Sequence, residues 1–264
     1  MWVWRRLLRI PWTAMRTNES ILVELNVTKR LSAICQERAL SLFGHIMRSS
    51  KHNLERLLIL GRVEGKRAQG RTPATCGGQT QRSASVLVPI CVDRGEVCLL
   101  YTLRSTKLSS HSGQVSFPGG KIDKNESVYE AALRETEEEI GIPAKDIEIW
   151  NKMSEVQGRD ATILITPVVG KIKDFDIEKL SPNEAEVADI FTISMKVFCD
   201  PENHGCYMYN NVSIPVFNGG KHRVWGITGI ITHLFLQSFL PNYLYYPDFL
   251  KKEYKLKELM PAKL

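Results

Sequence analysis

The residues best suited to chemistry are three glutamates within five positions, Glu135, Glu138 and Glu139, which follow Arg134 directly. On a helix, positions i, i+3 and i+4 share one face, so the three carboxylates would lie together. Like charges this close destabilise a helix, whereas a hard divalent cation such as Mg²⁺ prefers oxygen ligands and offsets the repulsion. Arg134 can hold a carboxylate by a bidentate contact. The spacing therefore indicates a metal-binding face, and a solvated acidic face is the alternative.

Glycines flank this acidic segment on both sides. Gly119 and Gly120 allow close backbone approach or a sharp turn ahead of the helix, and Gly141 ends it. From Gly120 to Gly141 the sequence reads Gly-x5-Glu-x7-Arg-Glu-x2-Glu-Glu-x-Gly. This spacing is far more specific than an acidic run alone.

The pattern resembles the Nudix box, the loop–helix–loop of Nudix hydrolases, with Thr136 where an aliphatic residue is usual. The resemblance implies a Mg²⁺- or Mn²⁺-dependent hydrolase of a nucleoside diphosphate linked to another moiety. It implies Glu135, Glu138 and Glu139 as metal ligands, and Arg134, Glu138 and Glu139 as catalytic groups. The chemistry agrees, because carboxylate-held metals neutralise a pyrophosphate and lower the pKa of a bound water. The sequence contains no P-loop, so kinase or NTPase chemistry of that type has no support.

A second motif precedes the box, running from Leu100 through Arg104 and Ser105 to Gly113 and Phe117-Pro-Gly-Gly. It resembles the signature of the coenzyme A pyrophosphatase branch. The resemblance implies cleavage of coenzyme A (CoA) or acyl-CoA to 3′,5′-ADP and 4′-phosphopantetheine or its acyl form. The substrate-binding residues that follow are Arg104, Ser105, Gly113, Phe117, Gly119 and Gly120. An ordinary surface charge at a strand end is the alternative for Arg104, and Ser109 replaces an arginine of the family pattern.

A further carboxylate is expected after the metal helix. The segment 181–191 resembles the loop and strand in which the family often has a carboxylate that helps with the metal or the water. Glu186 is our candidate for this catalytic position, and Glu184 is its rival. A plain surface loop is the third interpretation.

The elements that must position these residues follow from hydrophobic periodicity and turn signals. Strands surrounding one central helix, with a second buried helix near the end, predict an α+β fold. The resemblance makes this the Nudix fold, with a mixed sheet sandwiched between helices. We expect a late hairpin in which 207–217 and 221–225 pair around Asn218-Gly-Gly. The other expected strands are 86–92, 96–103, 147–150, 161–169 and 191–194, and the expected helices are 126–140 and 225–239.

The chain divides into segments of opposite charge. Residues 1–82 contain 15 basic and 5 acidic residues, a net of +10, whereas 83–264 carry a net of −4. We expect a helical basic appendage with a linker over 1–82, a Nudix domain over 83–250 and a charged tail over 251–264. Residues 4–75 resemble the tail of a retrotransposon-encoded reverse transcriptase, which indicates a captured fragment or a faulty gene model. A mitochondrial presequence and a nucleic-acid-binding arm are the alternatives.

The remaining features concern location and partners. The six cysteines lack the spacing of metal ligands or of a disulfide framework, which indicates a reduced, intracellular protein. The sequence has no run of 18 apolar residues, so a membrane span is not expected. The segment 262–264, Ala-Lys-Leu, is a variant of the peroxisomal address and predicts a peroxisomal import receptor as partner. The mitochondrion is the alternative location. A small molecule, CoA or acyl-CoA, is the expected partner, ahead of another nucleoside diphosphate derivative and of nucleic acid.

Overall fold

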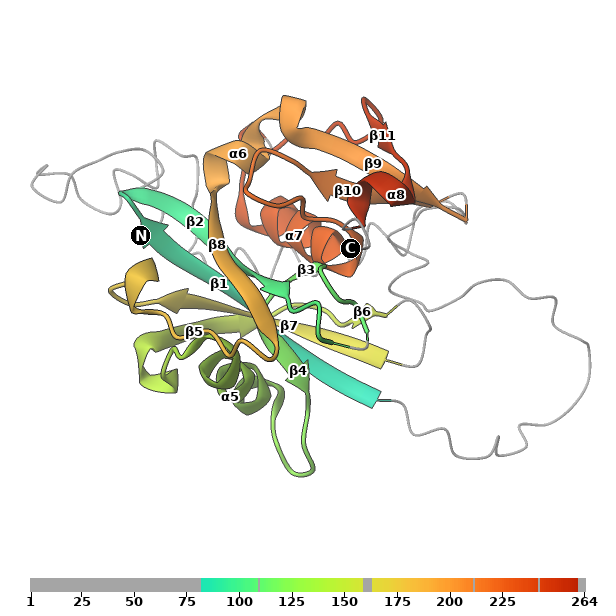
Figure 1. The fold of residues 1–264 in the computed structure, drawn as a ribbon. Coiled ribbons are helices and arrows are strands. Elements are labelled where there is room, and N and C mark those ends of the chain that lie inside the picture. Colours follow the sequence, from blue (N-terminus) through green and yellow to red (C-terminus); the bar gives the residue numbers. More distant parts are fainter. Residues whose placement is uncertain (1–81, 109, 159–162, 211, 242, 261–264) are drawn as a thin grey trace, which may run out of the picture.

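The computed structural model describes residues 82–108, 110–158, 163–210, 212–241 and 243–260 (Figure 1). The predicted basic appendage up to residue 81, Ser109 and the tripeptide 262–264 lie outside the described residues and stay predictions. Within the described residues, no helix has the length and apolar character that a membrane crossing requires.

The centre of the fold is an eight-stranded mixed sheet with the main order β3-β2-β1-β7-β5. β4 pairs with β1, β6 with β7, and β8 with β2 at an edge. β1 and β7 run parallel, and the other pairs in this sheet run antiparallel. The bounds are β1 (Arg82–Asp93), β2 (Glu96–Arg104), β3 (Val115–Ser116), β4 (Gly119–Lys121), β5 (Ile147–Lys152), β6 (Val156–Gln157), β7 (Ile163–Ile172) and β8 (Val187–Ser194).

Two helices cover opposite faces of this sheet (Figure 1), and the alternation of side chains along β2 explains why. Cys98 and Leu100 pack into the cluster that includes α5 (Val128–Ile140), whereas Leu99 and Tyr101 pack into the cluster that includes α7 (Gly226–Phe239). Successive strand residues point to opposite faces, so a strand buried on both sides needs apolar residues throughout. The predicted α+β sandwich is confirmed.

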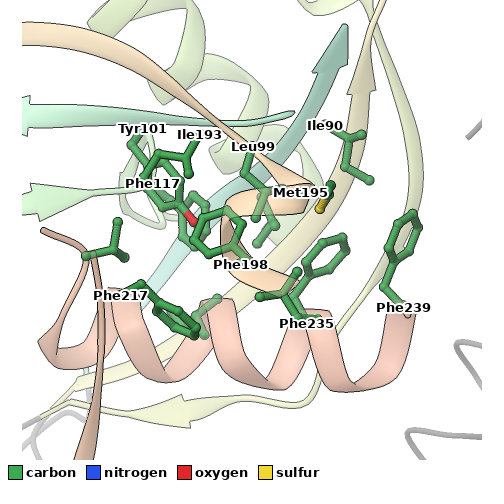
Figure 2. Packing of buried hydrophobic residues seen from close by; sticks show 14 of the residues in the cluster. Ile90, Leu99, Tyr101, Phe117, Ile193, Met195, Phe198, Phe217, Phe235 and Phe239 are labelled. Carbon is green, nitrogen blue, oxygen red and sulfur yellow. The ribbon is translucent and has the colours of Figure 1, made fainter. Parts of the chain in front are cut away.

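Aromatic rings fill the space between the sheet and α7 (Figure 2). Tyr101 stacks on Phe117 at 4.7 Å between ring centroids and on Phe191 at 5.7 Å. The Tyr101 hydroxyl hydrogen-bonds Thr232 of α7 at 3.0 Å, and Thr228 donates to the carbonyl of Val115 at 2.9 Å. These two buried polar contacts attach α7 to β2 and β3, the strands on either side of the predicted substrate loop.

The chain after β8 forms a second, three-stranded sheet in the order β10-β9-β11. The predicted continuous strand 207–217 is wrong, because the chain already turns between β9 and β10 at Asn210, which tolerates its φ of 48°. Only an isolated bridge between Phe217 and Val224 spans the Asn218 turn in the described residues. The bounds here are α6 (Met195–Cys199), β9 (His204–Tyr209), β10 (Val212–Phe217), β11 (Glu253–Tyr254) and α8 (Leu256–Leu259), with short 3₁₀ turns at Ala144–Asp146, Ile177–Lys179 and Pro201–Asn203.

Candidate active site

The helix α5 carries the acidic face, and local sequence determines where it begins and ends. The Ser127 hydroxyl accepts from the Glu130 N–H at 3.2 Å, and the Glu130 carboxylate accepts from the Ser127 N–H at 2.8 Å. This reciprocal capping box satisfies backbone donors that the first turn leaves open. At the other end Gly141 adopts the left-handed φ of 75°, a conformation that glycine adopts without strain. The register of the functional face is therefore set by its own caps.

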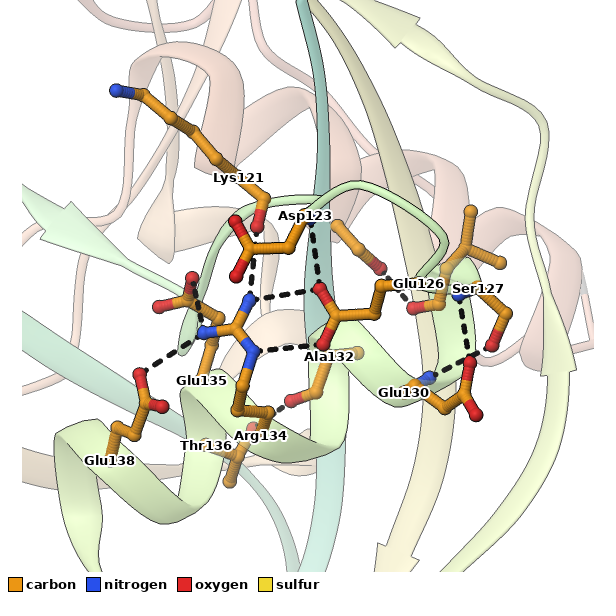
Figure 3. A network of polar contacts seen from close by, with 12 residues as sticks. Lys121, Asp123, Glu126, Ser127, Glu130, Ala132, Arg134, Glu135, Thr136 and Glu138 are labelled. Atoms are coloured by element: carbon orange, nitrogen blue, oxygen red, sulfur yellow. Dashed lines mark hydrogen bonds and ion pairs between the residues drawn. The ribbon is translucent and has the colours of Figure 1, made fainter.

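Arg134 lies at the centre of a polar network on this face (Figure 3). Its Nε and Nη2 donate to the two oxygens of Glu126 at 2.8 and 3.0 Å, and Nη2 also donates to the Lys121 carbonyl at 3.1 Å. Its Nη1 donates to Glu135 and Glu138, at 3.1 Å each. Hydrogen bonds from Arg134 lower the pKa of Glu126 to about 2. Arg134 thus joins the preceding loop to the acidic helix.

The three predicted metal ligands have different environments. The Glu138 side chain is 56% exposed, that of Glu135 is 16% exposed, and Glu139 as a residue is 3% exposed. Burial is the main cause that raises the pKa of Glu135, with contributions from Glu138 and Glu186. Burial raises the pKa of Glu139 to about 8, although the positive charge of Arg104 opposes this shift. Glu139 is therefore the carboxylate that most needs a cation to be ionised at neutral pH.

Arg104, at the end of β2, is near the Glu139 carboxylate. Its Nε is buried and has no hydrogen-bond partner among the described residues. Buried donors are normally satisfied, so an unsatisfied one requires an explanation. The position beside the acidic helix suits a phosphate oxygen of a ligand, which would accept this hydrogen bond.

The two adjacent glycines ahead of α5 are required by close contacts. Gly119 has a φ of 151°, and a Cβ there would lie 2.3 Å from the Ser85 carbonyl oxygen. A Cβ on Gly120 would lie 2.4 Å from the carboxyl carbon of Glu135. The Gly119 N–H donates to Glu139 at 3.4 Å. Because glycine has no Cβ, the backbone at these two positions can lie directly against the acidic face.

The predicted substrate loop links β2 to β3, and its contacts are mostly with itself. Gly113 donates from its N–H to the Arg104 carbonyl at 3.0 Å, and the Arg104 N–H donates to the Gln114 carbonyl at 3.0 Å. Ser105 donates from its N–H to the Glu186 carbonyl at 2.8 Å. This bond places the backbone before β8 beside the motif. Phe117, predicted to bind substrate, is 3% exposed and has its ring in the core.

The end of the described chain also contacts this loop. The Gln114 side chain hydrogen-bonds His111 at 3.1 Å through its oxygen and approaches the Met260 sulfur at 3.5 Å through its nitrogen. Arg223 donates to the Glu258 carbonyl at 2.7 Å and lies over the Tyr254 ring at 5.2 Å. The segment 253–260 is therefore attached to the body of the protein rather than extending from it.

Glu186 is close enough to the acidic face to raise the pKa of both Glu135 and Glu139. Of the two candidates for the extra carboxylate, this influence favours Glu186 over Glu184. Glu126 has no predicted role of its own, although its fixed position in the motif pattern indicates one. The structure makes it the bidentate partner of Arg134.

The acidic face suits a hard divalent cation, because the buried Glu139 carboxylate needs a compensating positive charge and its neighbours are oxygen donors. As the described side chains stand, no three acidic, histidine or cysteine residues converge closely enough to hold an ion. One oxygen of Glu135 and one of Glu138 each contact the Arg134 guanidinium.

Comparison with known proteins agrees with this geometry. The NUDIX domain model matches residues 81–201. Mitochondrial coenzyme A diphosphatase NUDT8 of Mus musculus is 39% identical over 168 residues, which cover 61% of this chain and 80% of that protein. The protein of the same name from Homo sapiens is 39% identical over 61% of this chain and 70% of its own length. Nudix hydrolase 3 of Caenorhabditis elegans is 35% identical over a region that covers 60% of this chain and 73% of that protein. On these matches, and with the box in place on α5, the chain belongs to the Nudix family.

Proposed function

We propose that this protein hydrolyses the pyrophosphate bond of CoA or acyl-CoA, giving 3′,5′-ADP and 4′-phosphopantetheine or its acyl form. The observation that carries the proposal is the position of Arg104, whose buried, unsatisfied Nε lies beside the acidic helix. The motif typical of CoA pyrophosphatases and the metal-binding motif thus meet at one place. The relatives named coenzyme A diphosphatases support the same substrate.

The acidic face would hold Mg²⁺ or Mn²⁺ through Glu135, Glu138 and Glu139. A bound divalent ion would neutralise the pyrophosphate charge and lower the pKa of a bound water. The exposed Glu138 side chain is described in contact with Arg134. A change of rotamer would turn it toward Glu135 and Glu139. Arg134 keeps Glu135 oriented through the second Nη1 bond.

The other groups of the site act on the substrate and the water. Arg104 would donate its free Nε–H to a phosphate oxygen, a charge-assisted hydrogen bond. Glu186 is our candidate for the base that takes a proton from the attacking water. The oxygen of that water forms a bond to one phosphorus, the bond from this phosphorus to the bridging oxygen breaks, and the bridging oxygen leaves with the other phosphate. No nucleophilic side chain is needed.

We place this activity in the mitochondrion, because the relatives from mouse and human are named as mitochondrial. The peroxisomal location predicted from residues 262–264 receives no support from these relatives. Fractionation of cells that produce the full, untagged chain tests this proposal. Co-purification with a mitochondrial matrix marker is expected, and co-purification with peroxisomes instead would contradict it.

A product assay tests the proposed reaction most directly. The purified chain is incubated with Mg²⁺ or Mn²⁺ and, separately, with CoA, an acyl-CoA, ADP-ribose and NADH. We expect metal-dependent release of 3′,5′-ADP from CoA or its ester, at a kcat/KM at least tenfold above that for ADP-ribose or NADH. Preferential cleavage of ADP-ribose or NADH would instead identify a Nudix hydrolase of another nucleoside diphosphate derivative.

A further inference from the structure

A second charged cluster lies on β8, on the opposite face from α5. The Asp189 carboxylate accepts a hydrogen bond from Lys221 at 2.9 Å and lies 2.8 Å from Nε2 of His222. Partial burial opposes ionisation of Asp189, but hydrogen bonds from Lys221 and His222 outweigh it and lower its pKa. The three residues come from segments more than 30 positions apart, so the fold assembles this cluster.

Packing holds the loop 218–223 against β8. The His222 ring meets Phe191 edge-on at 5.0 Å between centroids. A Cβ on Gly220 would lie 2.5 Å from the Ile193 side chain, so the loop backbone rests directly on the strand. The loop therefore follows β8 from Ile193 back to Asp189 and presents Lys221 and His222 at a defined position.

This position is beside the candidate active site. β8 runs antiparallel to β2, with Asp189 opposite Leu103 and Val187 opposite Arg104. Glu186 directly precedes the strand. Asp189 lies three positions after Glu186 along the chain, a length of roughly 10 Å in a strand. Among the described strands β8 pairs only with β2 and is an edge strand, so no further strand lies between its two faces at this edge.

The cluster places hydrogen-bond donors where an anion could reach them. One carboxylate faces a lysine and a histidine, and the Lys221 side chain is 63% exposed. An ammonium group has three donors, and the two described contacts of Lys221 are both with Asp189. Arg223, the next basic residue, is instead committed to the Glu258 carbonyl and the Tyr254 ring. Lys221 and His222 are thus the basic residues of this loop that face β8.

We propose that Lys221 and His222, held in place by Asp189, form a binding subsite for a phosphate monoester, the 3′-phosphate of CoA. The inference rests on the proposed function. CoA carries a pyrophosphate and a separate 3′-phosphate on opposite sides of one ribose. The protein sites that bind these two groups must therefore lie a short distance from each other. Arg104 is near the Glu139 carboxylate of the acidic face, so we assign it to the pyrophosphate and the cluster on β8 to the 3′-phosphate.

Kinetics with paired substrates test the subsite. Dephospho-CoA has the same pyrophosphate bond as CoA and lacks the 3′-phosphate. In Lys221→Ala we expect KM for CoA to rise about tenfold or more, the loss of a charge-assisted contact, with KM for dephospho-CoA changed less than twofold. Lys221→Arg should retain most of the preference for CoA. Lys196→Ala is the matched control, because Lys196 is also exposed and paired with a carboxylate, but just after the other end of β8.

A binding measurement separates this proposal from the proposed reaction. Calorimetry of the wild-type chain should show tighter binding of adenosine 3′,5′-bisphosphate than of 5′-AMP, and Lys221→Ala should remove the difference. Inorganic phosphate at equal concentration should compete weakly, since it lacks the nucleoside. Equal changes in KM for both substrates in Lys221→Ala, or equal affinities for the two nucleotides in the wild type, would overturn the subsite. Absence of CoA hydrolysis with this binding preference intact would overturn the reaction alone.

Discussion

Alanine substitution of the two adjacent glycines before the acidic helix should have opposite consequences for stability and activity. In Gly120→Ala the new Cβ meets the carboxyl group of Glu135 at 2.4 Å, and an ordinary contact needs 3.4 Å or more. The end of a flexible side chain can move by this difference of about 1 Å at little cost. The free energy of unfolding should therefore change by less than about 1 kcal/mol, partly because alanine also restricts the unfolded chain. A displaced ligand is serious for catalysis, and a 1 Å error costs on the order of 100-fold.

In Gly119→Ala the clash is with backbone, at 2.3 Å from the Ser85 carbonyl oxygen and 2.5 Å from the Cα of Val86. The φ of 151° adds conformational strain for any L-residue. Together we expect a loss of about 3–5 kcal/mol in the free energy of unfolding.

Thermal unfolding and Mg²⁺ titration of CoA hydrolysis distinguish the two variants. Gly120→Ala should unfold within a few degrees of the wild type and need far more Mg²⁺ for half-maximal activity, or lose turnover altogether. Gly119→Ala should unfold at a much lower temperature. Wild-type turnover of Gly120→Ala at every Mg²⁺ concentration would refute the assignment of Glu135 as a ligand.

Three further predictions concern the rest of the chain. Glu138→Gln and Glu139→Gln should each lower turnover by several orders of magnitude without lowering the unfolding temperature, and near-normal turnover at saturating Mg²⁺ would contradict the metal assignment. The pKa of Glu126 falls from 4.5 to about 2 on folding, so the stability from its pairing with Arg134 is present above pH 4.5 and is lost as the pH falls toward 2. Denaturant titrations over this range should therefore show a steeper loss for the wild type than for Glu126→Gln, and parallel curves would argue against the pairing. A chain that starts near residue 80 should fold and keep full CoA hydrolysis, whereas a drop of several degrees in Tm would indicate that the first 80 residues stabilise the domain.

Local signals account for what the sequence predicts well. The Ser127–Glu130 capping box and Gly141 lie within or beside the helix that they delimit, so α5 is predicted to within two residues at each end. The apolar runs of β1 and β2 have the composition of strands buried on both faces, and the structure buries them in that way. Local chemistry also placed the glutamates of the acidic face on one helix.

Contacts between distant segments explain what the sequence could not supply. No periodicity indicates that Phe117 stacks on Tyr101, so its motif position suggested substrate binding while its ring lies in the core. The turn at Asn210 was missed because Asn218-Gly-Gly is the stronger local turn signal. The cluster of Asp189, Lys221 and His222 depends on how the loop after β10 folds back on β8, which is a tertiary feature.

The contact between Met260 and Gln114 has a practical consequence for work with this protein. Gln114 belongs to the loop that also carries Gly113, and Arg223 secures the same end of the chain at Glu258. An affinity tag or fluorescent protein fused after residue 264 would therefore be joined only four residues from a side chain that contacts the predicted substrate loop. If the fusion displaced Met260, KM would change for reasons unrelated to the substrate.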